Sequence, residues 1–274
     1  MNKRSEQLLY KNDLFHAAEL CLSSKDPDEK VHLTQKTADS WRKGEFFLGD
    51  TAVQPICEPG RPENPKLVAP RDVPKRGMHT EKARAVLIHA LCHIEFNAIN
   101  LAWDAVYRFR GLPEQYYADW IRVADEEAYH FNLVRDYLRS RGYDYGDFNA
   151  HDGLWEMATK TAHDPLVRMA LVPRVLEARG LDVTPGIMAR FKEAKINEVV
   201  KILEIIHHDE IGHVEIGSHW YHFLCEQRGL EPESLFHELL VKYMKGNVKG
   251  PFDHKSRLKA GFSQSELDYL DGAG

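Results

Sequence analysis

Residues 125–130 read Asp-Glu-Glu-Ala-Tyr-His, and residues 209–213 read Asp-Glu-Ile-Gly-His. Both stretches place a histidine three residues after a glutamate: Glu127 with His130, and Glu210 with His213. On an α-helix, residues three apart lie on one face, about one turn from each other. A carboxylate and an imidazole in this pattern can bind one metal ion from a single helix.

A lone glutamate precedes each motif by nearly the same distance. Glu95 lies 32 residues before Glu127, and Glu177 lies 33 residues before Glu210. The midpoint of the first interval is Gly111, which opens a Gly-Leu-Pro breaker. A turn there would place Glu95 and Glu127 level on two antiparallel helices, each about 24 Å from the turn at about 1.5 Å per residue.

The second interval is less regular. Its midpoint falls near residues 193–194, whereas the breakers Gly180 and Pro185-Gly186 come earlier. For the second pair of glutamates to be level, the third helix must pass through residues 181–186 with a kink or bulge. The turn is then expected at residues 194–197.

Long helices account for most of the chain around these motifs. Pro and Gly stand where helices should start and stop, and no alternating strand pattern of useful length occurs. The third helix could start at Asp152-Gly153, but Asp164-Pro165 fits an N-cap and a first helical residue better, with a kink at Pro173. The expected helices span 80–110, 113–141, a stretch reaching at least 180, and one ending near Gly229.

The flanks differ from this helical region. Residues 1–50 are mostly helical in pattern, with an amphipathic helix that includes Leu8 and Leu9 and ends near residues 23–27. Residues 51–77 contain six prolines, which excludes a regular helix and favours an extended arm lying over the helices; a disordered linker is the alternative. Residues beyond 246 form an irregular tail with a short helix at 263–270, which a capping box starts.

We therefore predict an all-α protein with three parts. Residues 1–78 form an N-terminal helix and proline-rich arm, residues 79–245 a four-helix bundle, and residues 246–274 the tail. The 42 acidic against 36 basic residues argue against non-specific nucleic-acid binding, although a specific RNA substrate stays open. No apolar stretch approaches about 20 residues, the amino terminus is polar, and the four cysteines are too sparse for a disulfide scaffold, so a cytoplasmic protein is expected.

The two motifs and the two lone glutamates together predict a di-metal site. Four carboxylates offset two divalent ions, oxygen ligands suit iron or manganese, and few protein ligands leave positions open for dioxygen. Taken singly, each glutamate reads equally well as a solvated helix face and each histidine as a core residue. The expected ligands, which would also be the catalytic residues, are Glu95, Glu127, His130, Glu177, Glu210 and His213.

The chain resembles the ferritin-like superfamily, and within it an uncharacterised bacterial family of ferritin-like domains. The resemblance rests on His93-Ile94-Glu95, residues 125–130, Leu176-Glu177-Ala178-Arg179-Gly180 and residues 209–213, and covers about residues 80–260. A more distant likeness is to the tRNA-modifying di-iron hydroxylases, which share the Glu-Ala-Arg segment. The resemblance implies a ferritin-like four-helix bundle with two iron ions, manganese being the alternative metal.

Three further residues are candidates for roles around these ligands. Asp209 precedes Glu210 as in the Asp-Glu-x-x-His of di-iron oxygenases, where this aspartate orients a ligand histidine. Asp125 is a weaker candidate for such a role. His207 lies three residues before Glu210 on the same face, where it would pack beside the ligands or serve as a seventh ligand, as in some N-oxygenases.

Three functions are compatible with this reading. The first is an oxidase or hydroxylase that activates dioxygen on an unidentified small molecule or modified nucleoside, with a separate electron donor. The second is iron or peroxide handling, as in ferritins and rubrerythrins. The third is a metal-free helical interaction module, in which the glutamates and histidines would be dispensable. No contact with a membrane is expected.

Overall fold

A computed structural model describes residues 12–245 and 248–272, and the regular elements in these residues are all helices. Two isolated β-bridges, Asp13 with Phe47 and Leu67 with Ala150, are the remaining pairings in the described residues. The chain divides into two compact units, Met1–Trp155 and Glu156–Gly274. The all-α class expected from the sequence is confirmed.

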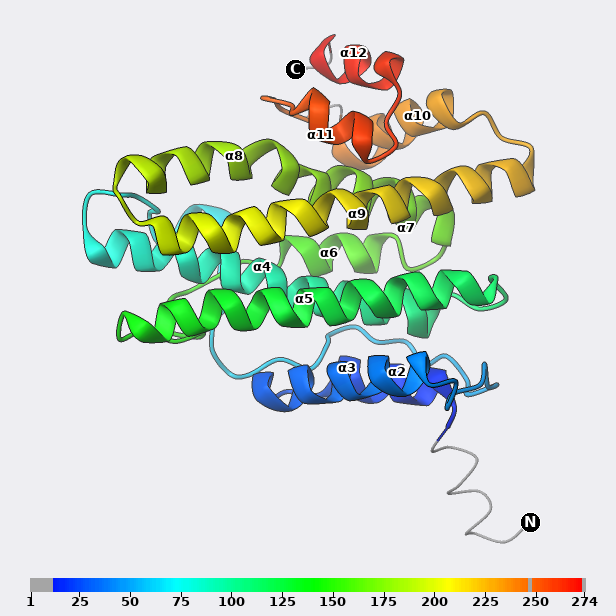
Figure 1. The fold of residues 1–274 in the computed structure, drawn as a ribbon. Helices are drawn as coiled ribbons and strands as arrows, with labels where there is room; N and C mark the ends of the chain where they lie inside the picture. The colour runs from blue at the N-terminus through cyan, green and yellow to red at the C-terminus, as the bar shows by residue number, and fades with distance from the viewer. Residues whose placement is uncertain (1–11, 246–247, 273–274) are drawn as a thin grey trace, which may run out of the picture. The chain divides into compact units, whose positions relative to one another are not determined.

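The first unit is built on two long helices, α4 (Glu81–Arg108) and α5 (Glu114–Ser140), which run side by side in opposite directions (Figure 1). The hydroxyl of Thr80 caps α4 by accepting a hydrogen bond from the Ala83 amide at 3.1 Å. Gly111, with a φ of 73°, allows the reversal between the two helices. Both helices match the predicted bounds to within two residues.

Helix α4 is more apolar than the sequence reading allowed. By length and composition it could cross a membrane, whereas we expected no such segment. However, 83% of its most apolar window is buried inside the structure, as in the core helix of a globular unit. Glu95, near the middle of this helix, is buried with 3% of its surface exposed.

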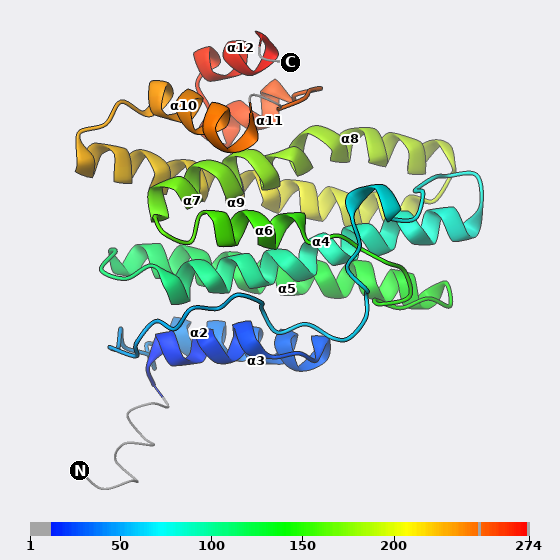
Figure 2. The same ribbon diagram turned by 180° about the vertical axis from the view of Figure 1, so that it is seen from behind.

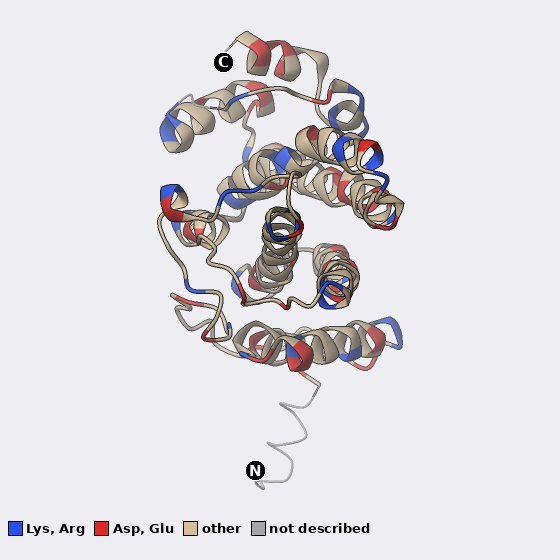
Figure 3. Ribbon diagram, turned by 90° about the vertical axis from the view of Figure 1, so that its left-hand side faces the viewer, with Lys and Arg blue, Asp and Glu red and all other residues tan. Residues whose placement is uncertain are grey.

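Two shorter helices lie beside this pair. Helix α2 (Leu14–Ser23) contacts α4, and α3 (Pro27–Arg42) contacts α5. The fully buried Lys30 donates to the carbonyls of Cys21 and Leu22 at 2.7 and 3.0 Å, which caps the carboxyl end of α2. Lys and Arg are interspersed with Asp and Glu along α3, whereas α2 carries no Lys or Arg (Figure 3). Leu8 and Leu9, which we placed on the first helix, lie outside the described residues.

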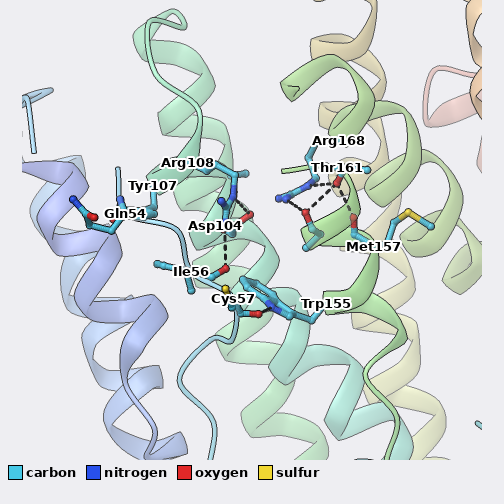
Figure 4. A network of polar contacts seen from close by, with 12 residues as sticks. Gln54, Ile56, Cys57, Asp104, Tyr107, Arg108, Trp155, Met157, Thr161 and Arg168 are labelled. Atoms are coloured by element: carbon cyan, nitrogen blue, oxygen red, sulfur yellow. Dashed lines mark hydrogen bonds and ion pairs between the residues drawn. The ribbon is translucent and has the colours of Figure 1, made fainter. Parts of the chain in front are cut away.

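The proline-rich stretch follows the surface of the first unit in an extended conformation, broken by one short 3-10 helix, η1 (Pro70–Asp72). Figure 4 shows its contacts with α4, where the backbone amide of Gln54 donates to the Tyr107 hydroxyl at 2.8 Å. The carbonyl of Cys57 accepts from the indole of Trp155 at 2.8 Å. These two bonds join the stretch to Tyr107 and Trp155 of the first unit.

The second unit contains another antiparallel helix pair, seen from behind in Figure 2. One side runs through α7 (Pro165–Leu171), the π-helical segment η2 (Val172–Glu177) and α8 (Ala178–Glu193). The other side is α9 (Asn197–Arg228), which ends at Gly229 in the left-handed conformation. The predicted turn at 194–197 is confirmed. The predicted bulge at residues 181–186 is wrong, because α8 continues through them; the irregular segment is η2, at the expected kink around Pro173.

Both of the alternative starts for the third helix are used. A separate helix, α6 (Gly153–Lys160), begins at the earlier site, and α7 begins at the later one with Asp164 as its N-cap. The Asp164 carboxylate accepts from the Leu166 amide at 2.8 Å. Proline is accepted at the first helical position because no intrahelical partner is needed there.

The carboxyl-terminal part is more helical than expected. Beyond Gly229 the chain forms α10 (Pro232–Met244), α11 (His254–Lys259) and α12 (Gln264–Gly272), of which only the last was predicted. Its capping box is reciprocal: the Ser263 amide donates to Glu266 at 2.9 Å, and the Glu266 amide donates to the Ser263 hydroxyl at 3.1 Å. The irregular tail is thus corrected to two short helices joined by loops.

Candidate metal centre

The first unit brings three of the predicted ligands together. Glu95 comes from α4, and Glu127 and His130 come from one face of α5. One ligand atom from each lies within 4.8 Å of the others. Nδ1 of His130 is 3.6 Å from Oε2 of Glu95 and 3.6 Å from Oε2 of Glu127. This spacing suits one cation, because donors at about 2.1 Å from a metal lie about 3–4 Å apart.

All three side chains are buried, with exposed fractions of 3%, 1% and 0% for Glu95, Glu127 and His130. Burial and the neighbouring Glu127 carboxylate raise the pKa of Glu95 to about 7. Burial alone would lower the pKa of His130, but its contacts with the two carboxylates dominate and raise it to about 12. The cluster therefore attracts positive charge.

One oxygen of this group has His130 at 3.6 Å as its ion-pair partner. Oε2 of Glu95 is buried and makes no hydrogen bond within the described residues. Such an oxygen is costly to bury unless something compensates it. The burial, the donor set and this oxygen fit a metal ion, and the group could hold one.

The metal-free cluster is expected to make the protein less stable as the pH rises. In the folded chain the pKa of Glu95 is about 7 and that of His130 about 12, whereas their ordinary pKa values are 4.5 and 6.5. The folded state thus binds more protons than the unfolded state across this range, so the free energy of unfolding falls with rising pH. The His130 contribution is complete below pH 6.5 and is lost toward pH 12.

Urea denaturation of the metal-free protein at pH 5, 7 and 9 measures this effect. His130→Gln is the matched control, since its pH profile should be flatter than that of the wild type. Equal slopes for the two proteins would contradict the charge state assigned to the cluster. Metal affinity should change in the opposite direction and strengthen with pH, because bound ligands must lose their protons.

The second unit holds the other three predicted ligands. Glu177 is the last residue of the π-helical segment η2, and Glu210 and His213 lie on α9. Nδ1 of His213 is 3.8 Å from Oε2 of Glu210, and His213 is buried. Glu177 is half-buried, and its Oε2 atom is buried.

The three residues considered for roles around the ligands are placed differently. Asp125 forms an ion pair with Arg42 of α3 at 2.9 Å, so its carboxylate is engaged away from the histidines. Asp209 and His207 are half-buried on α9. Nε2 of His207 is buried and makes no hydrogen bond in the part of the chain that the structure describes.

Sequence reasoning overlooked the contacts that hold η2. A methyl group added at Gly217 of α9 would lie 2.3 Å from both Cβ and Cγ of Pro173, so the proline ring sits directly against that glycine. Arg174 beside it is fully buried. The sequence predicts a kink at Pro173, but no local sequence feature indicates that Gly217 is in contact with it.

Comparison with known proteins gives a family. Residues 23–268 match the model of a family described as a protein of unknown function, DUF455. The chain belongs to this family. The DUF455 match extends further toward the amino terminus than the resemblance at residues 80–260 suggested, and it includes α3 and the arm.

A relative of this chain is found in Haemophilus influenzae. This "uncharacterized protein" is 54% identical over 216 residues, which cover 76% of this chain and 75% of the relative. No solved structure matches the chain. The comparisons therefore show a family of unknown function.

Proposed function

We propose that this DUF455 protein is a non-haem di-iron carboxylate protein. Each unit contributes an antiparallel helix pair with a lone glutamate on one side and Glu-x-x-His on the other. Two such pairs, brought together as a ferritin-like four-helix bundle, would supply four carboxylates and two histidines to two metal ions. The observation that carries the proposal is the buried cluster of Glu95, Glu127 and His130.

The donor chemistry supports iron, with manganese as the alternative. Carboxylate oxygens with one imidazole per ion suit both metals, whereas the cysteines contribute no thiolate to the cluster. Four glutamates would balance the four positive charges of two divalent ions. In the first unit, the two carboxylates and the imidazole would hold one ion in a site that is nearly closed to water.

We further propose that the activity is that of an oxidase or hydroxylase. Bound iron would supply the reduction of dioxygen coupled to oxidation of a small organic molecule or a modified nucleoside, with electrons from a separate donor. The chain's part is to hold the ions with few ligands and to exclude bulk water. Iron or peroxide handling is the competing outcome.

Metal content tests this proposal. Protein produced in iron-supplemented medium should contain about two metal ions per chain, the number that the bundle motif requires. Its optical spectrum should change when an anaerobic, reduced sample meets dioxygen. A preparation without bound metal, even after anaerobic incubation with Fe(II) or Mn(II), would leave the metal-free interaction module as the better reading. Uptake of iron far beyond two ions, or rapid peroxide turnover, would favour storage or peroxide handling.

A further inference from the structure

The segment that carries Glu177 is fastened by a buried arginine. Arg174 lies three residues before Glu177 and is fully buried. Its Nη2 donates to Oε1 of Glu266 at 2.6 Å, and its Nε donates to the Ser218 hydroxyl at 3.2 Å. The rings around the guanidinium, at 4.3–4.8 Å from ring centre to Cζ, belong to Tyr221, Phe236 and Phe262. A buried arginine is tolerated only with such pairing, so η2 is tied to α12.

The partner carboxylate is fixed in turn. While one oxygen of Glu266 accepts from Arg174, the other accepts from the Ser263 amide at 2.9 Å and caps α12. The hydroxyls of Ser263 and Ser265 both donate to Glu233 of α10 at 2.6 Å. The position of Arg174 therefore depends on how α12 is seated on the rest of the second unit.

A second attachment lies on the other side of Glu177. Arg179 donates to backbone carbonyls within residues 249–251, at 2.9 and 3.0 Å for the two shorter bonds. The buried Asp182 accepts two hydrogen bonds from Arg257 of α11, both at 2.8 Å. The described carboxyl-terminal residues 248–272, which we call the C-terminal clamp, thus grip the chain both before and after the glutamate.

We propose that the C-terminal clamp positions Glu177 for the metal, with Arg174 and Glu266 as the positioning residues. The inference rests on the proposed function, since Glu177 matters only as a ligand. A π-helical segment is rare and short, and it often marks a functional site. A π-helical turn holds more residues than an α-helical turn, so the direction of Glu177 depends on how this turn is held, and the contacts of Arg174 and Arg179 hold it on both sides.

Arg174→Met and Glu266→Gln test the clamp in the full-length protein. Both variants keep the side-chain volume and remove the ion pair. Titration with Mn(II) should show metal affinity weakened about 10–100-fold, the usual effect of losing a group that orients a ligand. Hydrogen–deuterium exchange of the metal-free protein should be faster at residues 172–177, and Arg174→Lys should restore part of both losses.

Asp164→Asn provides the matched control. It breaks another ion pair of the second unit, between Asp164 and Arg228 at 2.7 Å, which lies at the start of α7 and away from η2. This variant should change neither readout. Wild-type protein that binds no Mn(II) would sink the proposed function, and the clamp's role with it. If the wild type binds Mn(II) and both variants bind it equally well, the proposed role of the clamp is wrong while the proposed function stands. The same holds if hydrogen–deuterium exchange at residues 172–177 is no faster in the variants.

Discussion

Replacing Glu127 and His130 together with alanine is expected to abolish metal binding. The two changes remove two of the three clustered donors of the first unit and leave Glu95 alone. A single carboxylate cannot hold a divalent ion against water at micromolar metal. In the proposed di-iron function the four glutamates would serve the two ions together, so the second ion should be lost as well.

Thermal unfolding with and without Mn(II) measures this loss. A metal at about 100 times its dissociation constant stabilises the wild type by about 2.7 kcal/mol. That corresponds to a rise in Tm on the order of 5–10 °C for a chain of this size. The double variant should show no rise and should contain no iron after purification.

A control of the same helix and spacing is Asp119→Ala with Arg122→Ala. Both residues lie on α5 outside the buried cluster, so this protein should keep both ions and the full metal-dependent rise in Tm. If the Glu127 and His130 variant kept its two ions as well, the assignment of the ligands would be wrong.

Gly217→Ala is expected to be the most damaging small substitution in the second unit. The added methyl would lie 2.3 Å from two atoms of the Pro173 ring, which cannot rotate away. Overpacking of this kind costs about 3 kcal/mol and would lower the Tm on the order of 6–12 °C. Because the clash separates η2 from α9, it should also weaken metal binding through Glu177 and Glu210.

A double-mutant cycle isolates this contact. In a Pro173→Gly background the ring is absent, so Gly217→Ala should cost much less than it does alone. Gly186→Ala on α8 is the matched control, because its added methyl meets no atom within 4 Å, and it should be neutral or slightly stabilising. A Gly217→Ala protein as stable as the control would show that the proline and α9 are not in firm contact.

Much of the fold could be predicted because local signals agree with it. Thr80, Gly111 and Gly229 mark helix ends, and they do so in the structure. Helix α10 was missed because its N-cap is Glu231, a residue type that seldom caps helices. The six-residue α11 was missed because it is too short to show a periodic pattern.

The sequence predicts the arrangement of the candidate ligands better in the first unit than in the second. Glu95 and Glu127 were paired by counting residues from a turn, which works where the rise per residue is constant. In the second unit η2 breaks that regularity, so the same count could not place Glu177. The burial of Arg174 could not be predicted from the sequence, because its partner Glu266 is 92 residues away in the chain.

The proline-rich arm has a consequence for how the first unit forms. The bond from Trp155 to Cys57 joins residues 98 apart, and the ion pair of Arg61 with Asp152 joins residues 91 apart. Closing loops of that length costs more chain entropy than forming the α4–α5 hairpin, whose partners are neighbours along the chain. On entropic grounds we expect the hairpin to form before the arm is seated. The ligand cluster between α4 and α5 would then assemble early, and the arm would complete the unit last.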